Sequence, residues 1–298
     1  MTKRRWREGL GLTALNVFFI ALCFLTLIPI LYALSVSFNG SNSLLSSDFS
    51  FIPRNFTLKN YREVLFGENI TLWFRNTIFL AVVTVFLSLL VAVPAAYCFS
   101  RRRFPGRKAI LRCLVLLNSF PAILSMFAIY RLLRPMGLVN TRLGLILVYT
   151  GTMAVFSLWN TKGYFDTIPT EIEDAATIDG ASQIKVLFRV YLPMSLPSLA
   201  TIILFATVAN WNVWMDGYIY MNTPDKYPLQ TYLATKLMES KNNVETLMTP
   251  EQLMRMEQVS EKTIEAAQIF LAALPIMCVY PFLQKYYIKG IVVGSVKG

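Results

Sequence analysis

The chain alternates between long apolar stretches and short polar segments. A helix rises about 1.5 Å per residue, so about 20 residues cross a hydrocarbon core roughly 30 Å thick. Soluble helices usually keep a polar face. Six runs of at least 18 residues lack Lys, Arg, Asp and Glu altogether: 9–47, 76–100, 113–130, 143–161, 190–215 and 266–284. This pattern predicts an all-α integral membrane protein with six transmembrane helices, and it disfavours a soluble protein with buried helices. The predicted spans are 12–37, 74–99, 109–133, 141–162, 195–217 and 267–289.

The predicted spans define the domain organisation. Residues 1–11 form an N-terminal segment, 12–289 form a six-helix transmembrane domain, and 290–298 form a C-terminal tail. Four basic residues precede the first apolar stretch, as they do in a signal peptide. That stretch is too long for a signal peptide, and no small-residue cleavage pattern follows it closely, so we interpret it as a retained first span.

The charge distribution assigns the two sides of the membrane. The net charge is +11, and such a basic excess can indicate nucleic acid or an anionic surface. The predicted side that holds both termini has 16 basic and 6 acidic residues, whereas the other side has 12 and 11. Cytoplasmic loops are enriched in Lys and Arg. We therefore predict a multi-pass protein with both termini cytoplasmic, and the basic excess no longer suggests nucleic acid. Three arginines fall on the outer side, where they would snorkel to the interface or line an aqueous path: Arg131, Arg134 and Arg142.

The spans contain little chemistry of their own. No Lys, Arg, Asp or Glu lies in the middle of a predicted span, and the chain has no His, which argues against a proton-driven carrier. The chain has no Gly-x-x-x-x-Gly-Lys phosphate loop, no Cys-x-x-Cys pair and no visible nucleophile–base pair. We expect a chain that is not an enzyme and that binds no metal or cofactor itself. A stand-alone channel or secondary sugar carrier stays open as an alternative at this point.

The polar segment between the fourth and fifth predicted spans is the most informative. It predicts a helix of about nine residues within about 170–180, which is too short to cross a membrane. Thr170 and Glu173 have the spacing of a capping box at its start. Gly180 follows as a left-handed stop. We expect this helix to lie along the cytoplasmic face with an acidic, small-residue surface.

The order of elements in this segment resembles the signature loop of binding-protein-dependent ABC importer permeases. The matching residues are Asp174-Ala175-Ala176, Asp179-Gly180-Ala181 and Val190-Tyr191-Leu192-Pro193. Asp174 stands where that family usually has Glu. Other short motifs resemble the carbohydrate importers, including the smaller permease of the maltose importer: Leu58-Lys59-Asn60-Tyr61, Trp73-Phe74-Arg75-Asn76-Thr77, Ala95-Ala96-Tyr97, Trp211-Asn212 and Pro228-Leu229-Gln230. The long outer segment at about 238–263 is more similar to permeases of complex polysaccharide or lipo-oligosaccharide importers.

The resemblance implies a type I ABC importer permease fold and a transport role. The chain would be a permease subunit in a bacterial inner membrane that imports an oligosaccharide or polysaccharide by alternating access. Its partners would be a second, homologous permease in a heterodimer, two ATPase subunits that hold ATP and Mg, an extracytoplasmic sugar-binding protein and membrane lipid.

The resemblance also implies two contacts with the ATPases. The short helix would dock through Glu171, Glu173, Asp174, Ala175, Ala176, Asp179 and Gly180. The tail would reach between the ATPases through Gly294, Ser295, Val296, Lys297 and Gly298.

Candidate substrate-path residues come from the chemistry of sugars, since aromatic faces stack on sugar rings and amides bond hydroxyls. The candidates are Asn118, Asn160, Asn210, Trp211, Asn212, Trp214, Asp216 and Tyr218. Trp and Tyr also gather at membrane interfaces without contacting a substrate, which is the alternative for the aromatic members.

Overall fold

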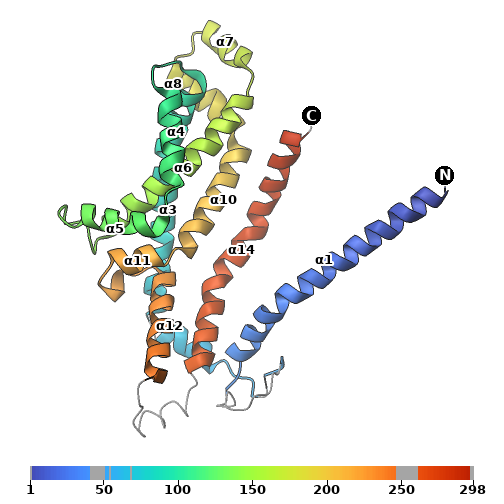
Figure 1. The fold of residues 1–298 in the computed structure, drawn as a ribbon, viewed down its shortest axis with the longest axis vertical. Helices are drawn as coiled ribbons and strands as arrows, with labels where there is room; N and C mark the ends of the chain where they lie inside the picture. The colour runs from blue at the N-terminus through green and yellow to red at the C-terminus, as the bar shows by residue number, and fades with distance from the viewer. Residues whose placement is uncertain (1, 41–50, 54, 68, 246–260, 296–298) are drawn as a thin grey trace. The chain divides into compact units, whose positions relative to one another are not determined.

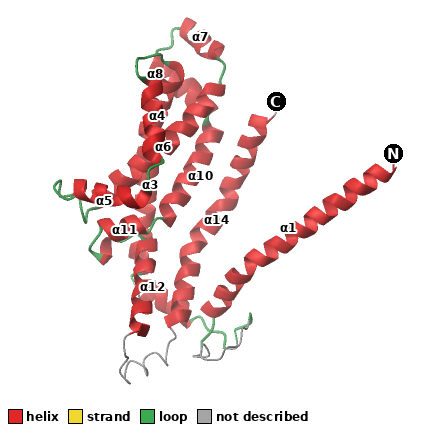
Figure 2. Ribbon diagram, viewed as in Figure 1, coloured by secondary structure: helices red, strands yellow, loops and turns green. Residues whose placement is uncertain are grey.

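The computed structural model describes residues 2–40, 51–53, 55–67, 69–245 and 261–295. These residues are mostly helical and include no β-strand (Figures 1 and 2). The chain divides into two compact units. The first unit contains Met1–Asn69 and Leu237–Ala273, and the second contains Ile70–Lys236 and Leu274–Gly298.

The first unit contains the first predicted span and a polar corner that follows it. Its elements include α1 (Thr2–Ser37), α2 (Lys59–Arg62) and the π-helical turn η2 (Glu63–Gly67). The Asn60 side chain donates to the Ser37 carbonyl at 2.9 Å and to the Asn39 carbonyl at 3.0 Å. The Ser37 hydroxyl lies 2.7 Å from the Tyr61 hydroxyl. The Asn60 bonds satisfy the carbonyl of Ser37, the last residue of α1, and that of Asn39 just after it, where the helix offers no partner.

The second unit contains most of the described helices. They are α3 (Ile70–Arg101), α4 (Arg107–Asn118), α5 (Ala122–Leu133), α6 (Arg142–Thr167), α7 (Thr170–Ile178), α8 (Gln183–Val186), η3 (Leu187–Tyr191), α9 (Leu192–Met194), α10 (Leu196–Asn212), α11 (Met215–Tyr220) and η4 (Pro224–Lys226). Two helices contain residues of both units: α12 (Leu229–Glu245) and α14 (Glu261–Ser295).

The helix α3 packs through one stripe of small and apolar residues. Its buried positions recur every three or four residues, which places them on one face: Trp73, Thr77, Leu80, Thr84, Ser88, Ala92 and Ala96. Large apolar residues such as Phe86 and Leu90 are exposed on α3. A helix with an apolar exposed face suits a lipid environment and not water.

Among the described residues, four helices are long and apolar enough to cross a membrane, or six when each of two bent pairs counts as one span. The four are Gly11–Ser37, Ile70–Arg101, Arg142–Thr167 and Thr263–Pro281. The third predicted span, 109–133, is not one helix: α4 and α5 meet at an angle of 102°. Pro121 precedes α5 with a non-helical ψ of 121°, and a proline cannot donate the hydrogen bond that would continue α4. The fifth predicted span, 195–217, begins at a bend of 75° between Gln183–Met194 and α10, and it is not one helix either, because α10 ends at Asn212 and α11 begins at Met215.

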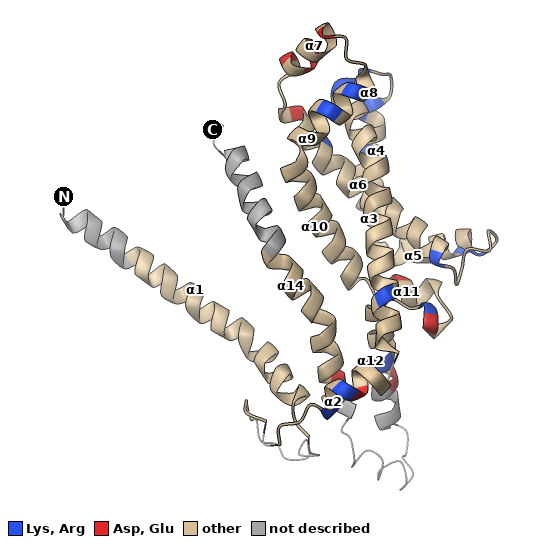
Figure 3. Ribbon diagram, turned by 180° about the vertical axis from the view of Figure 1, so that it is seen from behind, with Lys and Arg blue, Asp and Glu red and all other residues tan. Residues whose placement is uncertain are grey.

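The helix α7 lies at one end of the second unit, beyond the ends of α3, α6 and α10 (Figure 1). Charged residues gather at the helix ends, and the middle parts of α3, α6 and α10 carry few charges (Figure 3). Acidic residues mark α7, and basic residues mark the helix ends next to it. This end of the unit is called the α7 end below.

Candidate functional site

The short acidic helix forms as predicted, but its first turn is held differently. The helix α7 has nine residues, Thr170–Ile178. Its N-cap is Pro169, and no side chain caps it. The predicted capping box between Thr170 and Glu173 is therefore wrong. The reason is that the Glu173 carboxylate has stronger donors elsewhere.

The C-terminal end of α7 confirms the predicted glycine stop. Gly180 has a φ of 78°, which L-residues with a side chain rarely adopt. The Ala181 amide donates to the Ala176 carbonyl at 3.0 Å, and the Gly180 amide donates to the Thr177 carbonyl at 3.0 Å. This pair of bonds is a Schellman motif, which fixes the point at which the helix ends.

Glu173 faces inward and accepts hydrogen bonds from two other elements. The Tyr97 hydroxyl donates to Oε1 at 2.9 Å, and Arg102 Nη2 donates to the same oxygen at 3.0 Å. The Tyr191 hydroxyl donates to Oε2 at 3.0 Å. The Glu173 side chain is only 13% exposed. Hydrogen bonds to an ionised carboxylate are stronger than neutral ones, so Glu173 ties α7 to α3 and η3.

Arg101 joins the same cluster to the end of α6. Its Nη2 donates to the carbonyls of Phe165, at 2.7 Å, and Ile168. A cation at these carbonyls satisfies the end of the helix and complements its dipole. The Arg101 guanidinium also lies 5.2 Å from the centre of the Tyr191 ring, and its Nε is 3.9 Å from Glu173 Oε2. We call Tyr97, Arg101, Arg102, Glu173 and Tyr191 the Glu173 cluster.

An apolar core lies under α7. Ile172, Ala176 and Ala181 pack against it. The core draws buried residues from α3, α6, α8, η3 and α10: Val93, Ala96, Tyr97, Phe165, Ile168, Val186, Leu187, Tyr191, Leu199 and Ile202. Because both polar and apolar contacts hold its inner face, α7 is seated firmly on the second unit.

The outer face of α7 combines acid with exposed apolar surface. Of the seven predicted docking residues, Glu173 and Ala176 face inward, and the exposed ones are Glu171, Asp174, Ala175, Asp179 and Gly180. Sequence reasoning missed Ile178, which is 86% exposed, and Ile184, which is 71% exposed. The available signal for Ile178 was a second large aliphatic residue in the acidic segment, six positions after Ile172, which packs inward.

The predicted tail contact falls largely outside the described residues. Gly294 and Ser295 are the last residues of α14, and Val296, Lys297 and Gly298 are not among the described residues. The contact therefore stays a prediction.

The predicted substrate-path residues divide into buried and exposed groups. Asn210 is 5% exposed and donates to the Thr84 hydroxyl at 2.9 Å, which joins α10 to α3. Trp211 is also buried, near the Phe74 ring. Asn160 and Asn212 are exposed and donate to carbonyls of their own helices. Asn118 and Tyr218 are exposed, and Trp214 and Asp216 are partly buried.

Among the described residues, one of the three arginines predicted on the outer side has a side-chain partner. Arg142 Nη2 donates to Asn76 Oδ1 at 3.0 Å. The Asn76 amide in turn donates to the carbonyls of Asp225, at 2.8 Å, and Tyr227, at 3.1 Å. Arg142 thus joins α6 to α3 and to the segment after α11, although it is exposed, as Arg131 and Arg134 are.

A family match covers most of this unit. Residues 85–292 match the binding-protein-dependent transport system inner membrane component. The chain belongs to this family. The matched residues include α7 and the whole signature loop, so the predicted resemblance is confirmed. The chain is an inner-membrane permease component of a transport system.

Similar proteins extend the match to nearly the full chain. Protein LplC of Bacillus subtilis is 34% identical over 276 residues, which cover 92% of this chain and 90% of LplC. The polygalacturonan/rhamnogalacturonan transport system permease protein YtcP of the same organism is 30% identical and covers 94% of this chain and 96% of its own.

A solved structure confirms the predicted ABC importer permease fold. It is the crystal structure of a bacterial ABC transporter involved in the import of the acidic polysaccharide alginate. One of its chains is 28% identical to this permease, with a TM-score of 0.78, and the match covers 94% of this chain and 97% of that one.

Proposed function

We propose that this permease is the membrane-spanning subunit of an ATP-driven importer of an oligosaccharide or polysaccharide. The observation that carries the proposal is α7, whose inner face is fixed to the second unit and whose outer face is exposed. A rigid surface element of this kind can receive a force and pass it to the spans. The polysaccharide named for YtcP and the alginate named for the solved transporter support the substrate class.

The outer face of α7 offers two kinds of contact to an ATPase. Glu171 and Asp174 can each pair with a Lys or Arg, and charge-assisted hydrogen bonds are strong when water is excluded. Ile178 can enter an apolar cleft, in which an exposed aliphatic side chain gains free energy by burial. Ala175 and Gly180 have small or no side chains, so an ATPase surface can approach the backbone of α7 closely at these positions.

Force on α7 would reach the spans through its inner contacts. The Glu173 cluster connects α7 to α3, η3 and the end of α6. The partner ATPases bind ATP and Mg, close on each other and draw α7 with them, and α3 and α6 follow. A second permease completes the pathway, and an extracytoplasmic binding protein delivers the saccharide. The α7 end and both termini face the cytoplasm, where the basic residues concentrate.

The test compares two substitutions at Gly180. In Gly180→Val, a β-branched residue must adopt a φ of 78°, although no atom lies within 4 Å of the added Cβ. The end of α7 should shift, and coupled ATPase activity of the assembled transporter in proteoliposomes should fall at least tenfold while the protein still inserts. Gly180→Asn is the matched control because Asn tolerates this region and has room here. Full activity in Gly180→Val would contradict docking through this end of α7.

A stand-alone carrier predicts a different result. Proteoliposomes that contain only this permease should show no uptake of labelled oligosaccharide, and uptake should appear only with the co-purified ATPases and ATP. Uptake by the permease alone would support the carrier instead.

A further inference from the structure

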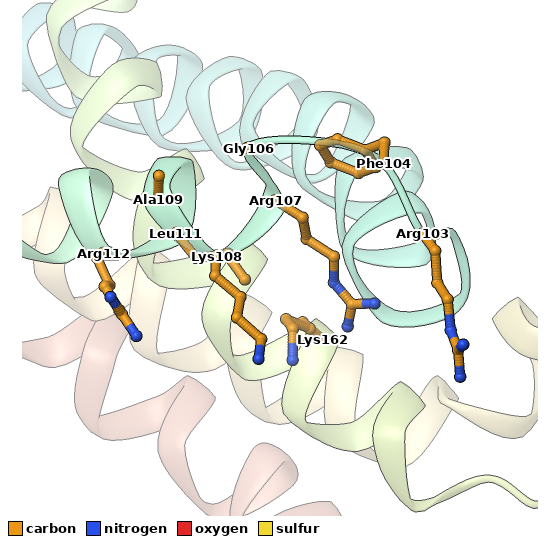
Figure 4. Close-up of a pocket in the computed structure, with 9 residues that line it drawn as sticks. All are labelled: Arg103, Phe104, Gly106, Arg107, Lys108, Ala109, Leu111, Arg112 and Lys162. Atoms are coloured by element: carbon orange, nitrogen blue, oxygen red, sulfur yellow. The ribbon is translucent and has the colours of Figure 1, made fainter.

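A cavity beside the start of α4 is lined mainly by basic residues (Figure 4). Its volume is about 780 Å³. Five of its lining residues are cations, and none is an acid: Arg103, Arg107, Lys108, Arg112 and Lys162. The first four come from the α3–α4 turn and α4, and Lys162 comes from α6. We call this the basic pocket.

The turn that joins α3 to α4 brings these cations together. Gly106 has a φ of 84° and allows the chain to reverse between Arg103 and Arg107. In Figure 4 the side chains of Arg103, Lys108 and Arg112 extend to the same side of the turn. Residues on both arms of the turn therefore line one cavity.

Only part of this charge is neutralised within the protein. Lys162 pairs with Asp166 at 2.6 Å. Arg107 donates to two backbone carbonyls, those of Arg102 at 3.2 Å and Ser100 at 3.4 Å, which carry no full charge. Among the described residues, the side chains of Arg103, Lys108 and Arg112 form no ion pair or hydrogen bond. Uncompensated cations around one cavity attract an anion.

The surface next to the basic pocket is apolar and exposed. On α4, Ile110 is exposed between residues that line the pocket, and Val115, Leu116 and Leu117 are exposed beyond it. On a membrane helix such a surface faces acyl chains. An anion for this pocket would therefore be at the boundary between headgroups and hydrocarbon, where a lipid has its phosphate.

We propose that the basic pocket binds the phosphate of an anionic phospholipid, with the acyl chains along the exposed side of α4. Basic pockets at the ends of membrane helices are suited to such headgroups. A free phosphate has the same anionic chemistry, but it would gain nothing from the apolar surface of α4. The occupied pocket would lie next to the Glu173 cluster, since Arg103 follows Arg102 in the chain, so the bound lipid would stabilise the α3–α4 turn beside α7.

The test measures lipid binding by the purified transporter in nanodiscs. The nanodiscs contain phosphatidylcholine alone or phosphatidylcholine with phosphatidylglycerol, and bound lipid is counted by native mass spectrometry. The double variant Arg103→Gln/Arg112→Gln should retain at least tenfold less phosphatidylglycerol, given about 1 kcal/mol for each basic residue near an anionic surface. Retention of phosphatidylcholine should not change.

Two further variants keep the result interpretable. Arg131→Gln/Arg134→Gln removes the same charge from exposed arginines on α5 and the turn after it, and it should retain phosphatidylglycerol fully. Arg103→Lys/Arg112→Lys should also retain it, which separates lost charge from misfolding. Equal loss in both Gln variants, or loss in neither, would overturn the proposal. Displacement of phosphatidylglycerol by millimolar inorganic phosphate would overturn the lipid assignment and indicate a free-anion site.

Discussion

Two of the polar contacts that join helices of the second unit are built from different chemistry. The Glu173 cluster at the α7 end is charged and links four elements through a carboxylate and two guanidinium groups. The link between α3 and α10 is neutral, with the Asn210 amide donating to the Thr84 hydroxyl at 2.9 Å. Both are largely buried within the protein.

The difference follows from depth in the membrane. An ionised group in hydrocarbon is costly, so a bond at Thr84, near the middle of α3, is made from neutral groups. At a helix end, water and headgroups solvate what the protein leaves exposed. The charged cluster can therefore be the stronger of the two, and it lies where the proposed function needs stiffness. The neutral bond only aligns two spans.

The largest effect should come from Glu173→Ala. This change leaves Arg101, Arg102 and two tyrosine hydroxyls without their carboxylate. Arg102 is 37% exposed, so water can solvate it once the carboxylate is gone. We therefore expect the contacts that hold α7 on the second unit to weaken by about 2 kcal/mol, which is less than the cost of breaking a fully buried ion pair. Coupled ATPase activity of the reconstituted transporter should fall about tenfold or more, while the ATPases still co-purify.

Its control is Glu173→Gln. The amide oxygen can take the place of Oε1 and still accept from Tyr97 and Arg102, whereas the amide nitrogen takes the place of Oε2 and cannot accept from Tyr191. The loss should therefore be smaller than that of Glu173→Ala. A second comparison is Asp174→Ala on the exposed face, which should keep the melting temperature and reduce ATPase co-purification. If Glu173→Ala behaved like Asp174→Ala, the inner and outer faces of α7 would not have separate roles.

Arg101→Lys should have the next largest effect. Lysine keeps the charge, but it lacks the planar guanidinium whose Nη2 bonds the carbonyls of Phe165 and Ile168 at the end of α6 and which stacks over Tyr191. We expect a loss of about 1–2 kcal/mol in thermal unfolding of the detergent-solubilised protein. The exposed neighbour Arg103→Lys is the control and should not change the melting temperature. An unchanged melting temperature in Arg101→Lys would indicate that Arg101 contributes only its charge to the cluster.

The sequence was sufficient for features that depend on neighbouring residues. The bounds of α7 follow from its local composition, and Gly180 alone indicates the stop. The sequence did not predict where the Glu173 side chain points. A capping box is a local pattern, whereas the real partners Tyr97 and Arg102 lie 76 and 71 residues away. A carboxylate takes the strongest donors that folding brings to it, and these are set by tertiary packing.

Local sequence patterns also did not predict two other features of the structure. Apolar runs predict that a segment is membrane-embedded, but they do not predict the 102° angle at Pro121, because a proline in a span can produce a kink or a full break. Asn210 was a candidate sugar ligand because amides bond hydroxyls. The hydroxyl that it bonds here belongs to Thr84 of the neighbouring helix.

Tyr191→Phe should have a smaller effect than the change at Arg101. It removes one hydroxyl, at 3.0 Å from Glu173 Oε2, and keeps the ring that packs against Phe165 and under Arg101. We expect a loss of about 1 kcal/mol. In a double-mutant cycle with Glu173→Gln, the two changes should be non-additive because they share one bond. Additive losses measured by thermal unfolding would show that the hydroxyl acts through another partner.

The smallest effect should come from Asn210→Ala. Thr84 stays satisfied after this change, because its hydroxyl also donates to the Leu80 carbonyl at 2.6 Å. Hydrogen bonds between membrane helices contribute about 0.6 kcal/mol on average, so the melting temperature should fall slightly and the KM for labelled oligosaccharide should not change. Asn212→Ala, an exposed amide on the same helix, should leave both unchanged. A several-fold rise in KM for Asn210→Ala at an unchanged melting temperature would place Asn210 on the substrate path, and the neutral cluster would then be a binding site instead of a helix contact.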